Sequence, residues 1–379
     1  MKLNLDDDEL ASCVSCGLCL PHCPTFRVSG EEALSPRGRI AAMRAVHLDG
    51  AEPTDQFVHF VETCVQCRGC EPACPSGVQF GHLMEGTRAT LAQRHRITPR
   101  WQRLGFSMLG RHRLLLTGSS ALAVAQRLRL VPKRAGLTRL SIRRSPALRS
   151  TGTDVWLFTG CVMDAWMRDT HHSTARVLQA LGVSWQVPGG GGACCGALHT
   201  HAGLIDDARG LARKVMASMP GEALIVVNSA GCGAALKEYG HLLGTPEAAA
   251  FGARVVDVHE FVAQRVDRLR PSRRMGRIIV QDPCHLRHVQ RTQAAVRTVL
   301  AVVGDVVELD DEGLCCGAGG AYSALQPELA GEIRERKLAS IARAGGGMVA
   351  SANPGCAMHL AAAGLAVKHP MDLVAEALA

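Results

Sequence analysis

Short apolar runs alternate with amphipathic segments from residue 154 to the end of the chain. The runs 155–158 and 224–228 are almost wholly apolar, as in buried strands, whereas 170–181 and 202–219 place apolar residues at helical spacing. Alternation of short strands with helices predicts an α/β arrangement in which the strands are mostly parallel.

This C-terminal part is an internal repeat. Its three cysteine-bearing motifs recur after 121 to 124 residues, which pairs Cys161 with Cys284, Cys195 with Cys316 and Cys232 with Cys356. Motifs duplicated at a nearly constant offset indicate two copies of one structural unit. We therefore expect two α/β domains, at 154–270 and 271–379.

The first 95 residues follow a different pattern, in which two short cysteine-rich loops are separated by helical segments. Ser35-Pro36 is a typical helix start, because proline is tolerated in the first turn. The segment 96–153 is also expected to be helical and to be divided by Pro99, Gly118 and Pro132. The chain thus begins with a helical module and a helical connector.

Length and composition indicate the setting of these domains in a cell. A chain of 379 residues is long enough for two or three domains. Its acidic start, with Asp6, Asp7 and Asp8, is unlike a secretory signal, so we interpret the 16 cysteines as metal ligands in a reducing cytoplasm. No apolar run reaches the roughly 18 residues of a spanning helix. Any membrane contact, on the inner face of the cell membrane, is therefore expected to be peripheral.

Positive charge is concentrated in one segment. Residues 86–153 contain fifteen Arg or Lys and no Asp or Glu, which leaves −7 for the rest of a chain whose net charge is +8. Such a segment can dock on anionic lipid, dock on an acidic partner subunit, or be a solvated connector. Nucleic acid is disfavoured, because aromatic residues that stack on bases are almost absent.

Two cysteine runs carry the strongest chemical signal. Each has the spacing C-x2-C-x2-C-x3-C-P, in which the fourth cysteine ligates the other cluster of a two-cluster ferredoxin. Zinc ribbons also use C-x2-C pairs, but not four evenly stepped cysteines before a proline. We therefore predict two 4Fe-4S clusters, the first held by Cys13, Cys16, Cys19 and Cys74 and the second by Cys64, Cys67, Cys70 and Cys23.

These clusters complete the predicted fold class, which is α+β and multidomain. A helical ferredoxin-like module with two 4Fe-4S clusters occupies 1–95, a basic helical connector 96–153, and a duplicated α/β Cys-Cys-Gly domain the remainder. Arg37 and Arg39 follow the first cysteine run. They are either solvated surface charges or cations placed behind the cysteine sulfurs, where they would stabilise the reduced state.

The duplicated domains offer a candidate site for an additional iron-sulfur cluster. Some of their cysteines follow predicted strands, where the chemistry of parallel sheets collects, and the others lie in glycine-rich loops such as 189–192 and 317–320. The candidate ligands are Cys161, Cys194, Cys195, Cys232, Cys284, Cys315, Cys316 and Cys356, with His285, His288 and His359 as weaker ones. Whether each domain holds a cluster or the two share one stays open.

With the diferredoxin runs and the duplicated Cys-Cys-Gly motifs, the whole chain resembles the iron-sulfur subunit of bacterial glycolate oxidase. The resemblance extends to the Ser35-Pro36-Arg37-Gly38-Arg39 box and to Lys237-Glu238-Tyr239-Gly240. It implies that a flavin-containing dehydrogenase subunit oxidises a 2-hydroxy acid and that this chain passes single electrons toward a quinone or other acceptor. Related iron-sulfur subunits of lactate, glycerol-3-phosphate and heterodisulfide systems are the alternative.

One departure from the heterodisulfide reductase pattern matters. That pattern ends each half in C-x2-C, whereas the second position here is Ala235 in one half and His359 in the other. The departure argues against the non-cubane cluster of that family and against disulfide chemistry. The rival functions are a catalytic thiol-disulfide reductase, which a fifth cysteine in each half would have favoured, and a non-catalytic metal or assembly scaffold. No G-x-G-x-x-G after a strand and no Walker loop is present, so we predict an electron carrier that is not catalytic alone.

Overall fold

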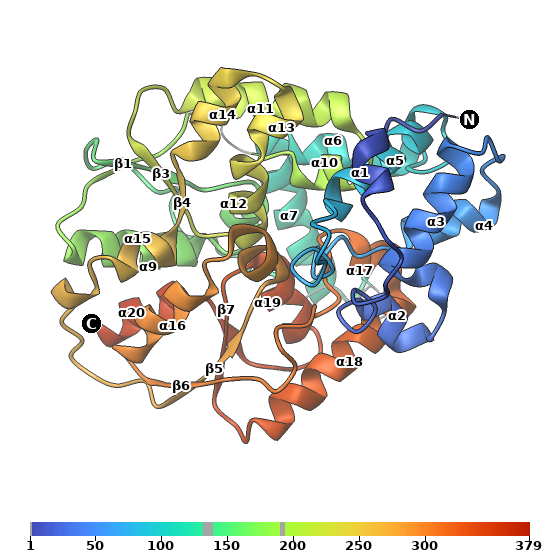
Figure 1. The fold of residues 1–379 in the computed structure, drawn as a ribbon. Helices are drawn as coiled ribbons and strands as arrows, with labels where there is room; N and C mark the ends of the chain where they lie inside the picture. The colour runs from blue at the N-terminus through green and yellow to red at the C-terminus, as the bar shows by residue number, and fades with distance from the viewer. Residues whose placement is uncertain (1, 132–138, 190–193) are drawn as a thin grey trace.

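The computed structural model describes residues 2–131, 139–189 and 194–379. A helical N-terminal part lies at one side of the molecule, and two sheets flanked by helices form the rest (Figure 1). This arrangement confirms the predicted α+β multidomain fold class. Among the described residues, no helix is both long enough and apolar enough to cross a membrane.

The N-terminal part is built from short helices around its own apolar core. Ser35 caps the helix Pro36–His47, since its hydroxyl accepts a hydrogen bond of 3.0 Å from the Gly38 N–H, so the predicted helix start is confirmed. Leu10, Met43 and Leu83 are fully buried there. The elements are α1 (Asp7–Ala11), α2 (Pro24–Ser29), the 3₁₀-helix η1 (Glu32–Leu34), α3 (Pro36–His47), α4 (Asp55–Glu62) and α5 (Phe80–Gln93).

The connector contains two helices, α6 (Arg100–Leu109) and α7 (His112–Arg127). Pro99 precedes α6 as predicted, but the break between the helices is at Gly110 and not at Gly118. Gly118 lies inside α7, where a Cβ atom would make an ordinary contact of 3.9 Å with Met108 Cε of α6. Pro132 lies outside the described residues.

The first sheet has four parallel strands in the order β2-β1-β3-β4. The helix predicted at 202–219 is present as the helix that begins at Ile205, and its start is delayed because Gly203 has φ +76° and a Cβ there would lie 2.3 Å from the Arg88 carbonyl oxygen. The elements are β1 (Val155–Phe158), α8 (Val162–Trp166), α9 (Arg168–Ala180), β2 (Trp185–Gln186), α10 (Ala197–His201), α11 (Ile205–Ser218), β3 (Leu224–Val227), α12 (Ala230–Lys237), α13 (Tyr239–Leu243), α14 (Pro246–Ala253), β4 (Val255–Asp257), α15 (Val258–Ala263) and the 3₁₀-helix η3 (Val266–Arg268).

The second sheet repeats this topology, with parallel strands in the equivalent order β6-β5-β7-β8. The internal repeat in the sequence is thus a structural duplication. The elements are β5 (Arg277–Gln281), the π-helix η4 (His285–Gln290), α16 (Gln293–Ala301), β6 (Asp305–Val307), α17 (Tyr322–Leu325), α18 (Pro327–Arg343), β7 (Met348–Ser351), α19 (Pro354–Ala361), β8 (Val367–Lys368) and α20 (Pro370–Ala377).

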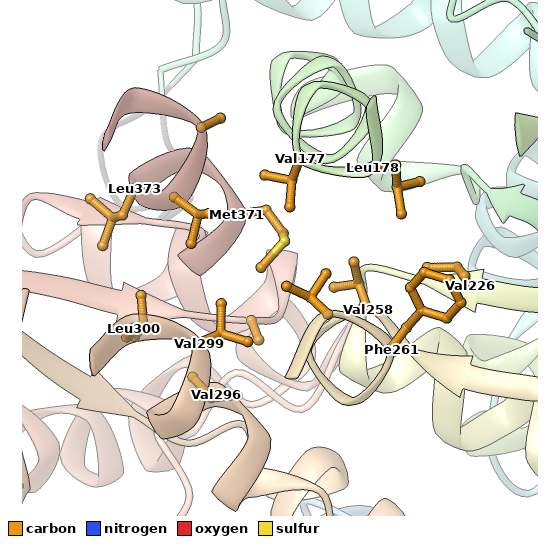
Figure 2. Close-up of a cluster of buried hydrophobic side chains, with 14 of the residues drawn as sticks. Val177, Leu178, Val226, Val258, Phe261, Val296, Val299, Leu300, Met371 and Leu373 are labelled. Carbon is orange, nitrogen blue, oxygen red and sulfur yellow. The ribbon is translucent and has the colours of Figure 1, made fainter. Parts of the chain in front are cut away.

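The two α/β domains share one hydrophobic core (Figure 2). Helices α9 and α15 of the first domain pack against α20 and α16 of the second, respectively. The loops that follow β3 and β7 are also joined, because Ala230 N–H donates to the Ala352 carbonyl at 3.1 Å. This shared core fixes the cysteine-bearing loops of both domains relative to each other. Its labelled side chains are Val177, Leu178, Val226, Val258, Phe261, Val296, Val299, Leu300, Met371 and Leu373.

Candidate iron-sulfur sites

The first N-terminal site is a cavity at the surface of the helical part. It is lined by the three leading cysteines of the first run together with Cys74 of the second run, and also by Arg37 and Cys70. The structure therefore brings together the four residues predicted for the first cluster. They are Cys13, Cys16, Cys19 and Cys74, of which Cys16 is exposed.

A second, more enclosed cavity lies beside it. It is lined by Cys23 of the first run with Cys64, Cys67 and Cys70 of the second, so these four predicted residues also meet. Cys70 lines both cavities, which places the two sites next to each other. We call them the Cys13 cavity and the Cys64 cavity.

The two cysteine loops share an unusual backbone conformation. Ser15 and Gly17 have φ of +57° and +83°, and the equivalent residues Gln66 and Arg68 both have φ of +58°. Three of these four residues carry side chains, for which the left-handed region is unfavourable. The same strain at matching positions indicates that both loops are shaped to enclose the same kind of bound group.

Arg39 lies behind the Cys64 cavity. It is 1% exposed, and its guanidinium donates to the Phe60 and Leu34 carbonyl oxygens at 2.6 Å each. It also reaches Cys23 Sγ at 4.0 Å. Arg37, by contrast, is partly exposed, donates to the Ser15 carbonyl at 3.2 Å and pairs with Glu32 at 2.6 Å. Of the two arginines, Arg39 is a buried cation next to a cysteine sulfur.

The first Cys-Cys-Gly site consists of two thiol pairs. Cys195 Sγ donates to Cys232 Sγ at 3.4 Å, and this hydrogen bond lowers the pKa of Cys232. A hydrogen bond with Cys161, assisted by His199, lowers the pKa of Cys194 to about 5 even though burial opposes the shift. In each pair the hydrogen bond between the thiols lowers the pKa of one sulfur, which favours the thiolate that metal ligation requires.

The second Cys-Cys-Gly site is built in the same way. Hydrogen bonds from Cys315 and Cys356 hold the pKa of Cys316 well below its usual range. The thiol of Cys315 also bonds Cys284 and, from outside the domain, Cys67 of the Cys64 cavity. The second Cys-Cys-Gly site is therefore in direct contact with the N-terminal part.

The residues at these sites fit iron-sulfur clusters. The thiols are mostly buried, those of the N-terminal part line two cavities, and backbone N–H groups point at sulfur, from Gln66 to Cys64 at 3.4 Å and from Gly317 to Cys315 at 3.3 Å. Such N–H···S bonds stabilise anionic cluster sulfurs. Within the described residues, no group of three or more His, Cys, Asp or Glu is arranged around a single metal ion.

The weaker histidine candidates have other partners. His359 lies 3.3 Å from the Ala330 carbonyl, and burial lowers the pKa of His285 to about 4. A Cβ at Gly69, in the Cys64 loop, would lie 3.3 Å from His288 Nε2, so this side chain of the second domain packs against the Cys64 loop. Residues 190–192 of the predicted glycine loop lie outside the described residues.

Sequence reasoning missed Arg88, which it counted among the surface charges of the basic segment. Arg88 is buried and donates to the backbone carbonyl oxygens of Val61, Cys64 and His201 at 2.7–2.8 Å. It therefore fixes the Cys64 loop to the first α/β domain. The only sequence signal was its place on the apolar side of the helix α5.

Two family models describe this combination of fold and sites. Residues 9–78 match a 4Fe-4S dicluster domain, and residues 155–237 and 278–361 match a cysteine-rich domain. The chain is therefore an iron-sulfur protein with two 4Fe-4S clusters and further cluster sites at its Cys-Cys-Gly motifs.

Full-length relatives identify the family. The chain is 32% identical to the probable glycolate oxidase iron-sulfur subunit of Bacillus subtilis, over 95% of this chain and 90% of the relative. It is also 32% identical to the glycolate oxidase iron-sulfur subunit of Escherichia coli, over 98% and 95%. A subunit of the heterodisulfide reductase of Methanosarcina barkeri is 28% identical over 98% and 94%. The chain belongs to the family of glycolate oxidase iron-sulfur subunits, whose members serve in electron transfer.

Proposed function

We propose that this chain is the electron-transfer subunit of a glycolate oxidase-like complex, in which a flavin-containing subunit oxidises a 2-hydroxy acid and a quinone-type molecule accepts the electrons. The arrangement of its cysteines carries the proposal: the surface Cys13 cavity adjoins the Cys64 cavity, which contacts the second Cys-Cys-Gly site through Cys67 and Cys315. Bound clusters would supply one-electron transfer, so the chain is not catalytic alone.

The two cavities support the predicted ligand sets. We assign Cys13, Cys16, Cys19 and Cys74 to the first cluster, and Cys64, Cys67, Cys70 and Cys23 to the second. Cysteines of both Cys-Cys-Gly sites would hold the additional cluster or clusters. The low pKa of Cys194 and of Cys316 supports their role as ligands, because the thiolate is the form that binds metal.

The surface around the Cys13 cavity is suited to docking of the flavin-containing subunit. Val14 is 70% exposed and Leu18 57%, and both line the cavity beside the exposed Cys16. Exposed apolar side chains around a redox site favour a partner that covers them. Arg37, at the rim, adds a charge that a partner carboxylate can meet.

A contact between domains leads from the Cys64 cavity to the second Cys-Cys-Gly site. Val65 of the Cys64 loop packs in one apolar cluster with Cys315 and Tyr322, and Tyr322 Oη donates to the Thr63 carbonyl at 3.1 Å. A Cβ at Gly319 would lie 3.0 Å from Val65 Cγ1, so the glycine permits this close approach. The short contact supports electron exchange between these two sites in preference to the first Cys-Cys-Gly site.

A cavity of about 210 Å³ supports a lipophilic acceptor near Cys64. Phe106 and Ile97 supply apolar walls, and Gln102 and Tyr322 supply polar groups that suit the carbonyl oxygens of a quinone. The absence of a fifth cysteine in each half, at Ala235 and His359, disfavours the heterodisulfide alternative.

Electron paramagnetic resonance on the purified complex with its flavin-containing subunit tests this function. Glycolate or lactate should reduce the cluster signals within the turnover time, and a short-chain quinone should reoxidise them. Signals that dithionite reduces but neither hydroxy acid reduces would contradict the proposed substrate class. Clusters reduced by substrate but not reoxidised by quinone would contradict only the acceptor.

A further inference from the structure

The helical hairpin α6–α7 presents an apolar surface that the fold does not cover. Its side chains are 38% to 67% exposed and follow helical spacing on both helices: Trp101, Leu104 and Met108 on α6, and Leu114, Val124 and Leu128 along α7 and its C-cap. Met108 lies against α7 at Gly118, which places the α6 stripe next to that helix. We call these six residues the hairpin surface.

The opposite side of the hairpin is firmly packed on the protein. Phe106 is buried with its ring 6.0 Å from that of His199 in α10, near α6 in Figure 1. Leu115 is buried in one cluster with Cys161, and Trp166 Nε1 donates to Ser119 Oγ at 2.8 Å. The hairpin surface is therefore the outer face of a seated element, not a core face that has lost its partner.

Arginines on the two sides of the hairpin differ in what they contact. Arg103 and Arg127 are partly buried, and each donates to backbone carbonyl oxygens, Arg127 to Leu140 at 2.8 Å. Arg111, Arg113 and Arg129 are exposed, and within the described parts of the chain none of them has a side-chain hydrogen bond or ion pair. The charges left for a partner thus flank the hairpin surface.

We propose that the hairpin surface lies on an anionic lipid bilayer. A tryptophan and leucines on one face suit the headgroup and acyl boundary, and flanking arginines suit lipid phosphates. Charge complementarity favours lipid, because the segment 86–153 has no acid to repel an anionic surface. Bilayer docking does not depend on which molecule accepts the electrons, and it would bring the cavity lined by Gln102 and Phe106 of α6 close to the membrane.

Vesicle binding tests the docking surface on the cluster-loaded chain. Vesicles of phosphatidylglycerol and phosphatidylcholine should bind the protein, and vesicles of phosphatidylcholine alone should bind it weakly. Binding should fade between 0.15 and 1 M salt, since the screening length falls from about 8 to about 3 Å. The triple variant Arg111→Gln, Arg113→Gln, Arg129→Gln should lose about a hundredfold in affinity, because each arginine contributes about fivefold.

Matched controls separate this surface from general charge. Arg213→Gln, Arg268→Gln and Arg336→Gln remove three exposed arginines elsewhere and should leave binding unchanged. Leu104→Ser should weaken binding, whereas Leu48→Ser, at another exposed leucine, should not. Circular dichroism and iron content verify that each variant is folded and loaded.

Trp101 provides an internal reporter, because it is the most exposed of the four tryptophans. Brominated lipids should quench its fluorescence on binding, and Trp101→Phe should remove the quenched component. The proposal is overturned if anionic vesicles do not bind, or if the triple variant binds like its control. Loss of the flavin-containing subunit from the triple variant, without any vesicle binding, would assign the surface to a protein partner instead.

Discussion

Acid should loosen the junction between the two α/β domains through His171. This histidine of α9 is fully buried, and its Nδ1 lies 3.0 Å from the amide nitrogen of Asn228, which donates to it. Burial lowers its pKa to about 4, against a weaker opposing effect of Asp164. His369, at the start of α20, packs nearby with its pKa also lowered by burial, so His171 and His369 both resist protonation in the folded state.

The sign and size of the effect follow from this depressed pKa. The unfolded chain binds a proton at His171 near pH 6.5 and the folded chain only near pH 4, so stability is complete above the unfolded pKa and is lost as the pH falls. A difference of two to three pKa units corresponds to about 3 kcal/mol in full and to about 2 kcal/mol between pH 7 and pH 5. For the two α/β domains taken together as one unit with a shared core, that loss lowers Tm by roughly 4–8 °C.

Thermal unfolding of His171→Asn at pH 7 and pH 5 measures this contribution. Asparagine can still accept the hydrogen bond from Asn228, so the variant loses packing to the same extent at both pH values. Between pH 7 and pH 5, its Tm should therefore fall by roughly 4–8 °C less than the Tm of the native protein. His172→Asn is the matched control, because His172 is more exposed and its Nε2 lies 2.9 Å from the Pro146 carbonyl. Iron is counted at both pH values. A His171 variant that loses as much Tm as the native protein would refute the reasoning.

Three further predictions concern the clusters. Cys74→Ser should damage the cluster at Cys13, Cys16 and Cys19, and resonance changes confined to the Cys64 cluster would exclude the crossover. Native protein should hold appreciably more than the roughly eight irons of the N-terminal part, and Cys195→Ser or Cys316→Ser should remove the excess; a native count of eight would exclude clusters at the Cys-Cys-Gly sites. Arg39→Gln should lower the reduction potential of the Cys64 cluster, because it removes a buried cation 4.0 Å from Cys23 Sγ. Arg37 is partly exposed, so Arg37→Gln should change the potential of the Cys13 cluster less. A redox titration that shows no shift for Arg39→Gln would contradict this role.

Local features could be predicted from the sequence because they depend on nearby residues. The strand at Val155–Phe158, the helix start at Ser35 and the duplication of the two sheets all follow from periodicity, capping and repeat spacing. The later start of α11, at Ile205, could not be predicted, since Gly203 is held in a left-handed conformation beside the Arg88 carbonyl, which is distant in sequence. The domain boundaries at 95, 153 and 270 stay predictions.

Contacts between distant segments could not be predicted from the sequence for the same reason. Arg88 reads as one more charge of a basic stretch, yet it holds the Cys64 loop because α5 returns beside that loop. The meeting of Cys67 with Cys315 depends on how the second α/β domain packs on the helical part, which no spacing within either motif encodes.

Duplication has produced two Cys-Cys-Gly sites with different surroundings. In the first, Cys161 and Cys194 are covered by Leu115 of the hairpin, whereas in the second Cys315 packs against Val65 of the Cys64 loop. Equal motifs therefore face unequal neighbours, the α6–α7 hairpin in one case and the Cys64 loop in the other. Because burial, nearby charge and hydrogen bonds to sulfur set the potential of a cluster, the two sites should differ in potential despite their common ligand pattern.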